Sequence, residues 1–144
     1  MQATGADQVI CTIEATQSGD DRYAAAPAVR VSFNYAKAPM KITAVSAPAS
    51  LNGAGPYTFI TSVLHVETEM NGGLSSLGHL LDVTSNSPTI CRVDSNVVYD
   101  QPGGLFNKTQ VTALSTGTCS IKFFFPGTTT RAATTLIWTG PAKR

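Results

Sequence analysis

The sequence predicts an all-β protein, an antiparallel β-sandwich, and three observations support this. Apolar and polar residues alternate with a period of two along most of the chain, as they do in half-buried strands. Clusters rich in Gly, Pro, Asn and Asp separate about nine or ten such segments, and turns recur roughly every 8–12 residues. Thr, Val, Phe and Ile, which suit a pleated surface, are frequent in these segments, whereas good helix formers are scarce.

The expected strands can be placed in order along the chain. The first is centred on Val9, Cys11, Ile13 and Ala15, which share one face. The others are expected over 29–34, 42–46, 57–68, 89–93, 96–99, 109–114, 118–125 and 133–139. In the strand over 118–125, the residues predicted to point inward are Cys119, Ile121, Phe123 and Phe125. The segment 74–81 is the one place where a helical turn could fit.

Length and charge exclude several classes of protein. The chain has 144 residues, enough for one ordinary domain, and only 13% are charged, against about 25% in an average domain. A formal net charge of +1 gives no strong field, so we expect no nucleic-acid partner. The apolar runs are far shorter than the roughly 20 residues that cross a bilayer, so no membrane insertion is expected. The first residues show no signal-peptide pattern.

The two ends of the chain share a pattern with a spacing of about 108 residues. The matched positions are Cys11 with Cys119, Ile13 with Ile121, Gly19 with Gly127, Ala24-Ala25 with Ala132-Ala133, Val29 with Ile137 and Val31 with Thr139. This predicts that 1–38 are the closing strands of a preceding repeat and that 39–144 form the next repeat nearly whole. So short an N-terminal segment cannot bury two sheet faces alone. We expect it either to pack as an extra hairpin or to be donated to a neighbouring chain.

The three cysteines leave one unpaired in any intramolecular scheme. Cys91 and Cys119 each lie on an alternating strand, and neighbouring strands could bring them together as a disulfide. Cys11 is then the unpaired cysteine. It is the counterpart of Cys119, and the partner of Cys11 would belong to the preceding repeat. Three free cysteines in a cytosolic protein are the alternative. A zinc site is disfavoured because the sequence has no Cys-x-x-Cys spacing.

Two cysteine motifs resemble those of bacterial immunoglobulin-like (Big-type) repeats. They are 87–93, Ser-Pro-Thr-Ile-Cys-Arg-Val, and 116–121, Thr-Gly-Thr-Cys-Ser-Ile. The stretch 11–26 is similar to the family's closing segment, whereas Phe125-Pro126-Gly127 and Arg131 depart from it, and 51–83 is longer than compact members need. The resemblance implies an immunoglobulin-like β-sandwich with an additional N-terminal β-hairpin. It also implies a non-catalytic tandem repeat of a secreted or cell-surface protein, serving as spacer and cell adhesion domain beside neighbouring immunoglobulin-like repeats.

No motif for catalysis, for cofactor binding or for a metal site occurs in the sequence, so we expect no enzyme, no cofactor and no metal. His65 and His79 lack ligand spacing and are interpreted as ordinary strand and loop residues. Asp20-Asp21, with Asp94 or Asp100, could bind calcium, but a solvated turn explains them better. An intramolecular amide joining Lys37 or Lys41 to Asn107 beside Asp100 is a further, weaker hypothesis.

The run Phe123-Phe124-Phe125 suggests a candidate ligand face. Phe124 is expected to point outward and, with Leu136 and Trp138 from the next strand, to form an exposed aromatic patch. Such a patch could bind a glycan or a surface protein. The alternative is that the N-terminal hairpin covers it. Binding through the loops 51–56, 70–78 and 100–107, and strand-exchange self-association, are the rival functions to a spacer.

Overall fold

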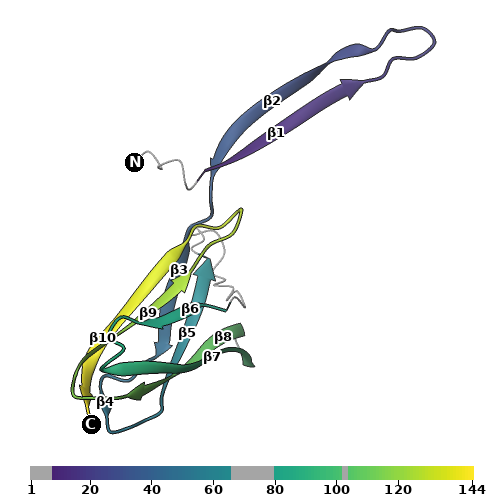
Figure 1. Cartoon of the computed structure of the whole chain (residues 1–144). Coiled ribbons are helices and arrows are strands. Elements are labelled where there is room, and N and C mark those ends of the chain that lie inside the picture. Colours follow the sequence, from purple (N-terminus) through teal and green to yellow (C-terminus); the bar gives the residue numbers. More distant parts are fainter. Residues whose placement is uncertain (1–7, 66–79, 102–103) are drawn as a thin grey trace. The chain divides into compact units, whose positions relative to one another are not determined.

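A computed structural model describes residues 8–65, 80–101 and 104–144 (Figure 1). Ten strands make up this part of the chain, and none of it is helical, so it holds no helix that could cross a membrane. The expected all-β class is confirmed. The chain divides into two compact units, Met1–Lys37 and Ala38–Arg144.

The first unit is an antiparallel hairpin of β1 (Gln8–Gln17) and β2 (Ala26–Ala36). Cross-strand partners run from Gln8 opposite Ala36 to Ala15 opposite Val29. The register then shifts, so that Gln17 lies opposite Ala26 and β2 has one residue more than β1 in this interval. The extra residue lies in the stretch that contains Pro27, which has no N–H to donate, as is common at a β-bulge.

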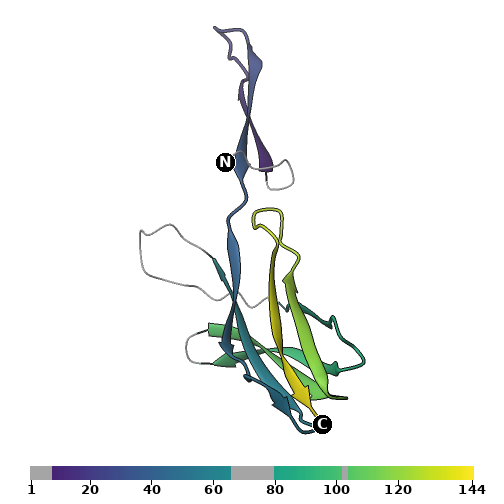
Figure 2. The ribbon, with the colours of Figure 1, turned by 90° about the vertical axis from the view of Figure 1, so that its left-hand side faces the viewer.

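The second unit is a sandwich of two four-stranded sheets (Figures 1 and 2). Its strands are β3 (Met40–Ser46), β4 (Leu51–Asn52), β5 (Tyr57–His65), β6 (Asp82–Ser85), β7 (Cys91–Gln101), β8 (Gly104–Ala113), β9 (Gly117–Phe125) and β10 (Thr134–Lys143). One sheet has the order β3-β5-β8-β7 and the other β4-β10-β9-β6. If β3 to β10 without β4 are taken as strands A, B, C, D, E, F and G, these are the ABED and CFG sheets of a constant-type immunoglobulin sandwich. The immunoglobulin-like expectation is thereby confirmed at the level of strand order.

The core lies between the two sheets. Every second residue of β9 is fully buried, and these are the four residues predicted to point inward: Cys119, Ile121, Phe123 and Phe125. The ring of Phe59 on β5 lies 5.9 Å from that of Phe123, between ring centroids, and is itself fully buried. Burying such aromatic rings supplies much of the hydrophobic stabilisation of a small sandwich.

Several expected elements differ from the structure. The two strands expected over 89–93 and 96–99 are one strand, β7, because a bulge between Val93 and Ser95 lets the pairing with β8 continue past the break in alternation. The short strands β4 and β6 were not expected. Leu80 and Leu81 are in neither a helix nor a strand, so the helical turn expected there is wrong at these positions, while 66–79 lie outside the described residues.

Two asparagines on β7 and β8 fix the chain where it enters β6 in the opposite sheet. Asn107 accepts a hydrogen bond from the backbone N–H of Leu81 at 3.0 Å, and Asn96 donates to the Leu81 carbonyl at 2.6 Å. Thr109 donates to the other side-chain atom of Asn96, its Oδ1, at 2.9 Å. Leu81 is buried, and without these side chains its backbone groups would be buried unpaired, at a cost of about 1–3 kcal/mol each.

Candidate interaction surfaces

The predicted disulfide is present and joins the two sheets. Cys91 begins β7 and Cys119 lies in β9, with Cα atoms 5.7 Å apart and both side chains fully buried. Cys11 is a free, half-buried cysteine, as expected. The alternative of three free cysteines is therefore wrong. Antibody domains place their bridge between strands B and F; here it runs from D to F, and β5, the B strand, contributes Phe59 to the core instead.

The expected ligand face of Phe124, Leu136 and Trp138 is wrong. Leu136 and Trp138 pack against the core, and Trp138 meets Phe59 edge to face with ring centroids 4.9 Å apart. Phe124 lies on the outer side of the same sheet, where the Lys122 ammonium is 5.1 Å from its ring centre. The three residues are thus on opposite sides of one sheet and cannot contact one ligand together.

The reason lies in how β9 and β10 pair. Phe124 is directly opposite Thr135, whereas Leu136 is opposite the inward Phe123. The outward neighbours of Phe124 on β10 are consequently Thr135 and Ile137. The stretch from Leu136 to Trp138 is apolar at every position, so its alternation cannot show which residues point inward, and only the pairing register decides it.

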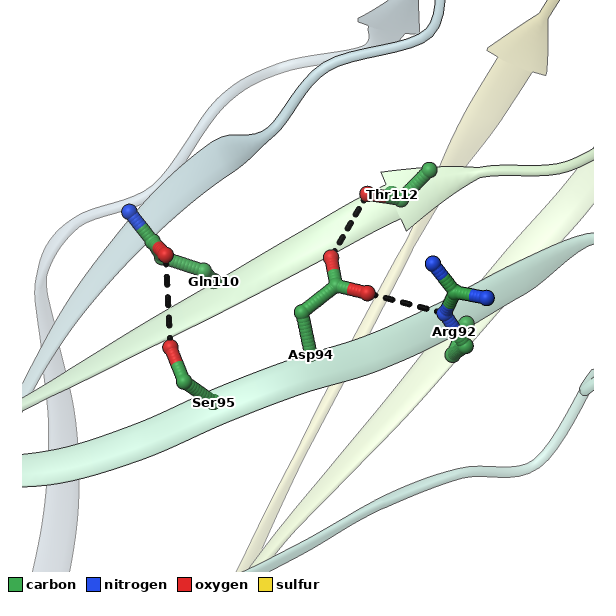
Figure 3. A network of polar contacts seen from close by, with 5 residues as sticks. All are labelled: Arg92, Asp94, Ser95, Gln110 and Thr112. Atoms are coloured by element: carbon green, nitrogen blue, oxygen red, sulfur yellow. Dashed lines mark hydrogen bonds and ion pairs between the residues drawn. The ribbon is translucent and has the colours of Figure 1, made fainter.

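A polar network lies on the outer face of β7 and β8 (Figure 3). Asp94 occupies the bulge of β7, where its carboxylate accepts hydrogen bonds from the Thr112 hydroxyl at 2.6 Å and from Arg92 Nε at 2.8 Å. The Thr112 hydrogen bond, aided by Arg92, lowers the pKa of Asp94 below its ordinary value of 3.8. Next along the sheet, Ser95 donates to Gln110 at 3.3 Å. This network ties two strands together across the bulge, and its carboxylate is occupied by internal donors.

The other candidate residues of the sequence are spread over the molecule. Asp20 accepts hydrogen bonds from the backbone N–H groups of Arg22 and Tyr23 and so closes the turn of the hairpin. It belongs to the first unit, and Asp94 to the second. No group of three His, Cys, Asp or Glu side chains that could hold a metal occurs among the described residues. His79 and the side chain of His65 lie outside the described part of the chain.

The hypothesis of an amide between a lysine and Asn107 does not fit the structure for Lys41. Asn107 is buried and hydrogen-bonded to Leu81, whereas Lys41 is exposed between the inward residues Met40 and Ile42. Lys41 therefore points away from the core that holds Asn107. Lys37 belongs to the first unit.

One face of the β1–β2 hairpin is a continuous apolar surface. Four directly opposed apolar pairs form it: Val9 with Tyr35, Cys11 with Phe33, Ile13 with Val31, and Ala15 with Val29. Five of these side chains are counted among the exposed large hydrophobic residues, with exposed fractions from 40% for Tyr35 to 60% for Val29. We call these eight residues the hairpin face. Monomers seldom leave so continuous an apolar patch uncovered.

The opposite side of the hairpin is mostly polar, with the exposed Ile10 as an apolar exception. Arg30 and Glu14 form an ion pair at 3.1 Å, and the hydroxyls of Thr12 and Ser32 are 2.7 Å apart. The hairpin is thus amphipathic, with one side suited to water and one suited to burial. Because a two-stranded hairpin alone is marginally stable, the hairpin face is the strongest candidate for an interaction surface. The alternation of the first strand indicated half of this face, and the cross-strand pairs with β2 supply the other half.

Comparisons with known proteins find distant structural similarity only. No protein-family model and no curated protein matches the chain. Among solved structures, the chain is similar to domains 4 and 5 of the S-layer protein SbsC, with 13% sequence identity and a TM-score of 0.46. The match covers 96% of this chain and 77% of that one.

Proposed function

We propose that the chain is a non-catalytic structural module of an extracellular or cell-surface protein, in which the second unit acts as a spacer between neighbouring domains. The observation that carries this is the pairing of the unit's two ends. The chain enters the unit at Ala38 beside the start of β10 and leaves it at the far end of β10, near Lys143 (Figure 1). With about 3.3 Å per residue, β10 alone separates these points by roughly 30 Å.

Parallel backbone contacts lie on either side of β10, one in the segment just before it and one at its C-terminal end. At the first end, the Ala38 N–H donates to Thr130 at 2.8 Å, and Ala38 accepts from Ala132 at 2.9 Å. At the other end, β4 pairs parallel with β10, and Gly53 donates to the Lys143 carbonyl at 2.7 Å. A pull on the two ends of the unit therefore slides Ala38 and β4 lengthwise past the segments that they pair with. The hydrogen bonds of both contacts are then loaded together in shear. Such an arrangement suits a module that transmits tension.

The buried disulfide supports the extracellular location. Disulfides persist in oxidising compartments and are rare in the cytosol. Here the bridge links the two sheets, so it also limits how far the unit can extend when it is pulled. The proposed extracellular location and spacer role apply to the second unit. Adhesion through its loops would be an additional property of the same unit.

Single-molecule stretching of the chain through its two termini tests the spacer function. We expect one unfolding event for the second unit, and reduction should lengthen the released chain by the 28-residue loop, roughly 100 Å. Ala38→Pro, which removes the N–H that bonds Thr130, should lower the unfolding force, whereas Ala38→Gly keeps that N–H and serves as the control. Unfolding at forces too small to detect would contradict a spacer under tension. Saturable binding to a glycan or cell surface would add adhesion to the role.

A further inference from the structure

The β1–β2 hairpin and the β9–β10 hairpin have the same construction around their turns. The pair that closes the first turn is Gln17 opposite Ala26, and the pair that closes the second is Phe125 opposite Thr134. Both members of the second pair lie 108 positions after those of the first. Each turn thus connects its strands with the same number of residues.

The two turns also share their internal contacts. Gly19 and Gly127 both have positive φ, 73° and 81°. A Cβ atom on either would lie within 3 Å of backbone atoms in the second half of the turn, so both positions require glycine. The following residue donates its N–H three residues ahead in both turns, at 2.9 Å: Asp20 to Tyr23, and Thr128 to Arg131.

The side chains after the two glycines play the same part. The Asp20 carboxylate accepts from the N–H groups two and three residues on, at 2.8 and 2.9 Å. The Thr128 hydroxyl accepts from the equivalent N–H groups at 3.3 and 3.2 Å. Different residues thus close the same turn with the same hydrogen bonds, a similarity that alternation of apolar residues alone would not require.

The hairpin face corresponds to the buried face of β9–β10. In the first hairpin Cys11 lies opposite Phe33, and in the second the equivalent Cys119 lies opposite Gly140. The next pair on the same face is Ile13 with Val31 in the first hairpin and Ile121 with Trp138 in the second. Because β2 has one extra residue at its bulge, Val29 and Val31 correspond to Leu136 and Trp138. The sequence alignment with Ile137 and Thr139 is therefore wrong by one position.

We infer that the β1–β2 hairpin is the closing F–G hairpin of another immunoglobulin-like sandwich. The hairpin face is then the docking surface for that sandwich's strands A to E, supplied by a preceding part of the same polypeptide. In β9, the residue equivalent to Cys11 is bonded to the cysteine that begins strand D. The partner therefore has a cysteine at the start of its own D strand, and this cysteine forms a disulfide with Cys11. The bond forms by thiol–disulfide exchange with a disulfide-bonded oxidoreductase of the secretory compartment, which takes up the two electrons and two protons of the two thiols and is reduced to its dithiol. The closing-hairpin assignment does not depend on the spacer function, because a closing hairpin can belong to any multidomain protein, whereas the Cys11 disulfide rests on the proposed extracellular location.

The chain's own strands provide a probe for this surface. A second copy of residues 38–116, which contain strands A to E of the second unit, is fused in front of residue 9 of the chain. The copy then precedes β1 as the original residues precede β9. A Thr89→Ser change in the added copy distinguishes its Cys91 peptide by mass. The control is the same extended chain with 117–143 in place of 9–36, so that the native hairpin closes the added strands. The control shows that the added strands fold.

We expect Cys11 to form a disulfide with the marked Cys91, and the amides of β1 and β2 to exchange at least about 100-fold more slowly than in the unextended chain. If the control forms its marked disulfide while Cys11 stays a free thiol and β1–β2 exchange is unchanged, the inference is overturned.

The unextended chain gives a second measurement that does not depend on the added strands. Its β1–β2 amides should exchange far faster than those of β9–β10, because the strands inferred to cover the hairpin face belong to a preceding part of the polypeptide. Protection equal to that of β9–β10 at every concentration would mean that the hairpin face is already covered within the chain. Protection that rises with concentration, together with dimers in sedimentation, would assign the face to a second copy. Either result would overturn the preceding sandwich as its occupant.

Discussion

The indole of Trp138 meets the ring of Phe59 edge to face, with centroids 4.9 Å apart and an interplanar angle of 79°. The contact joins β10 to β5 and so connects the two sheets of the sandwich. It packs the chain's one tryptophan, partly buried, against the core, where its ring stabilises the fold instead of standing out as a binding platform.

Trp138→Ala should lower the free energy of unfolding of the second unit by about 3 kcal/mol, because it removes a large ring from the core. Urea unfolding followed by circular dichroism measures the change. Ile137→Ala is the matched control, since Ile137 is the exposed neighbour at 57% and should change stability by less than about 0.5 kcal/mol. Equal effects of the two substitutions would contradict the inward position of Trp138.

Replacing both bridged cysteines, Cys91→Ala with Cys119→Ala, should cost about 3.5 kcal/mol of stability, because a loop of 28 residues is no longer closed in the unfolded chain. Denaturant midpoints of the oxidised protein and of the double variant measure the difference. Cys11→Ser removes the free cysteine and should leave the second unit's midpoint unchanged. A midpoint that falls as far for Cys11→Ser would disprove the assigned pairing.

Asn107→Leu should lower stability by about 1–3 kcal/mol, because the buried N–H of Leu81 loses its acceptor. Lys108→Leu is the control, because Lys108 is exposed on the other side of β8, whereas Asn107 is the residue that accepts the hydrogen bond from Leu81. Hydrogen exchange of the Leu81 amide provides a local measurement, and it should quicken in Asn107→Leu alone. An unchanged Leu81 exchange rate would contradict the proposed fixing of β6.

The Asp94 carboxylate makes stability depend on pH. Its pKa is lowered in the folded protein, so its contribution is fully present above the ordinary value of 3.8 and is lost as the pH falls through the lower folded value. The stability difference between the wild type and Asp94→Asn should therefore shrink below about pH 4. Thr112→Val removes the main cause of the shift and should weaken this dependence. A difference that stays constant from pH 7 to pH 2 would contradict the network.

Short-range patterns in the sequence already determine the all-β class and the inward face of β9, because strict alternation fixes which residues face the core. The pairing of Cys91 with Cys119 was expected from the placement of both cysteines on alternating strands and from the repeat that sets Cys11 aside, and the structure confirms it. The candidate ligand face failed where alternation fails, at the continuously apolar stretch from Leu136 to Trp138. The bulge at Asp94 likewise broke one strand into two expected ones.

Tertiary structure alone decided the features that depend on register and on distant partners. The phase of β10 follows from its pairing with β9, and the place of β6 follows from two asparagines that are distant from it in sequence. The sequence indicated a repeat between the ends of the chain, but the one-residue offset in β2 is set by a bulge that only the cross-strand pairs reveal. A one-residue shift reverses which side of a strand faces the core, which is why register decided each of these points.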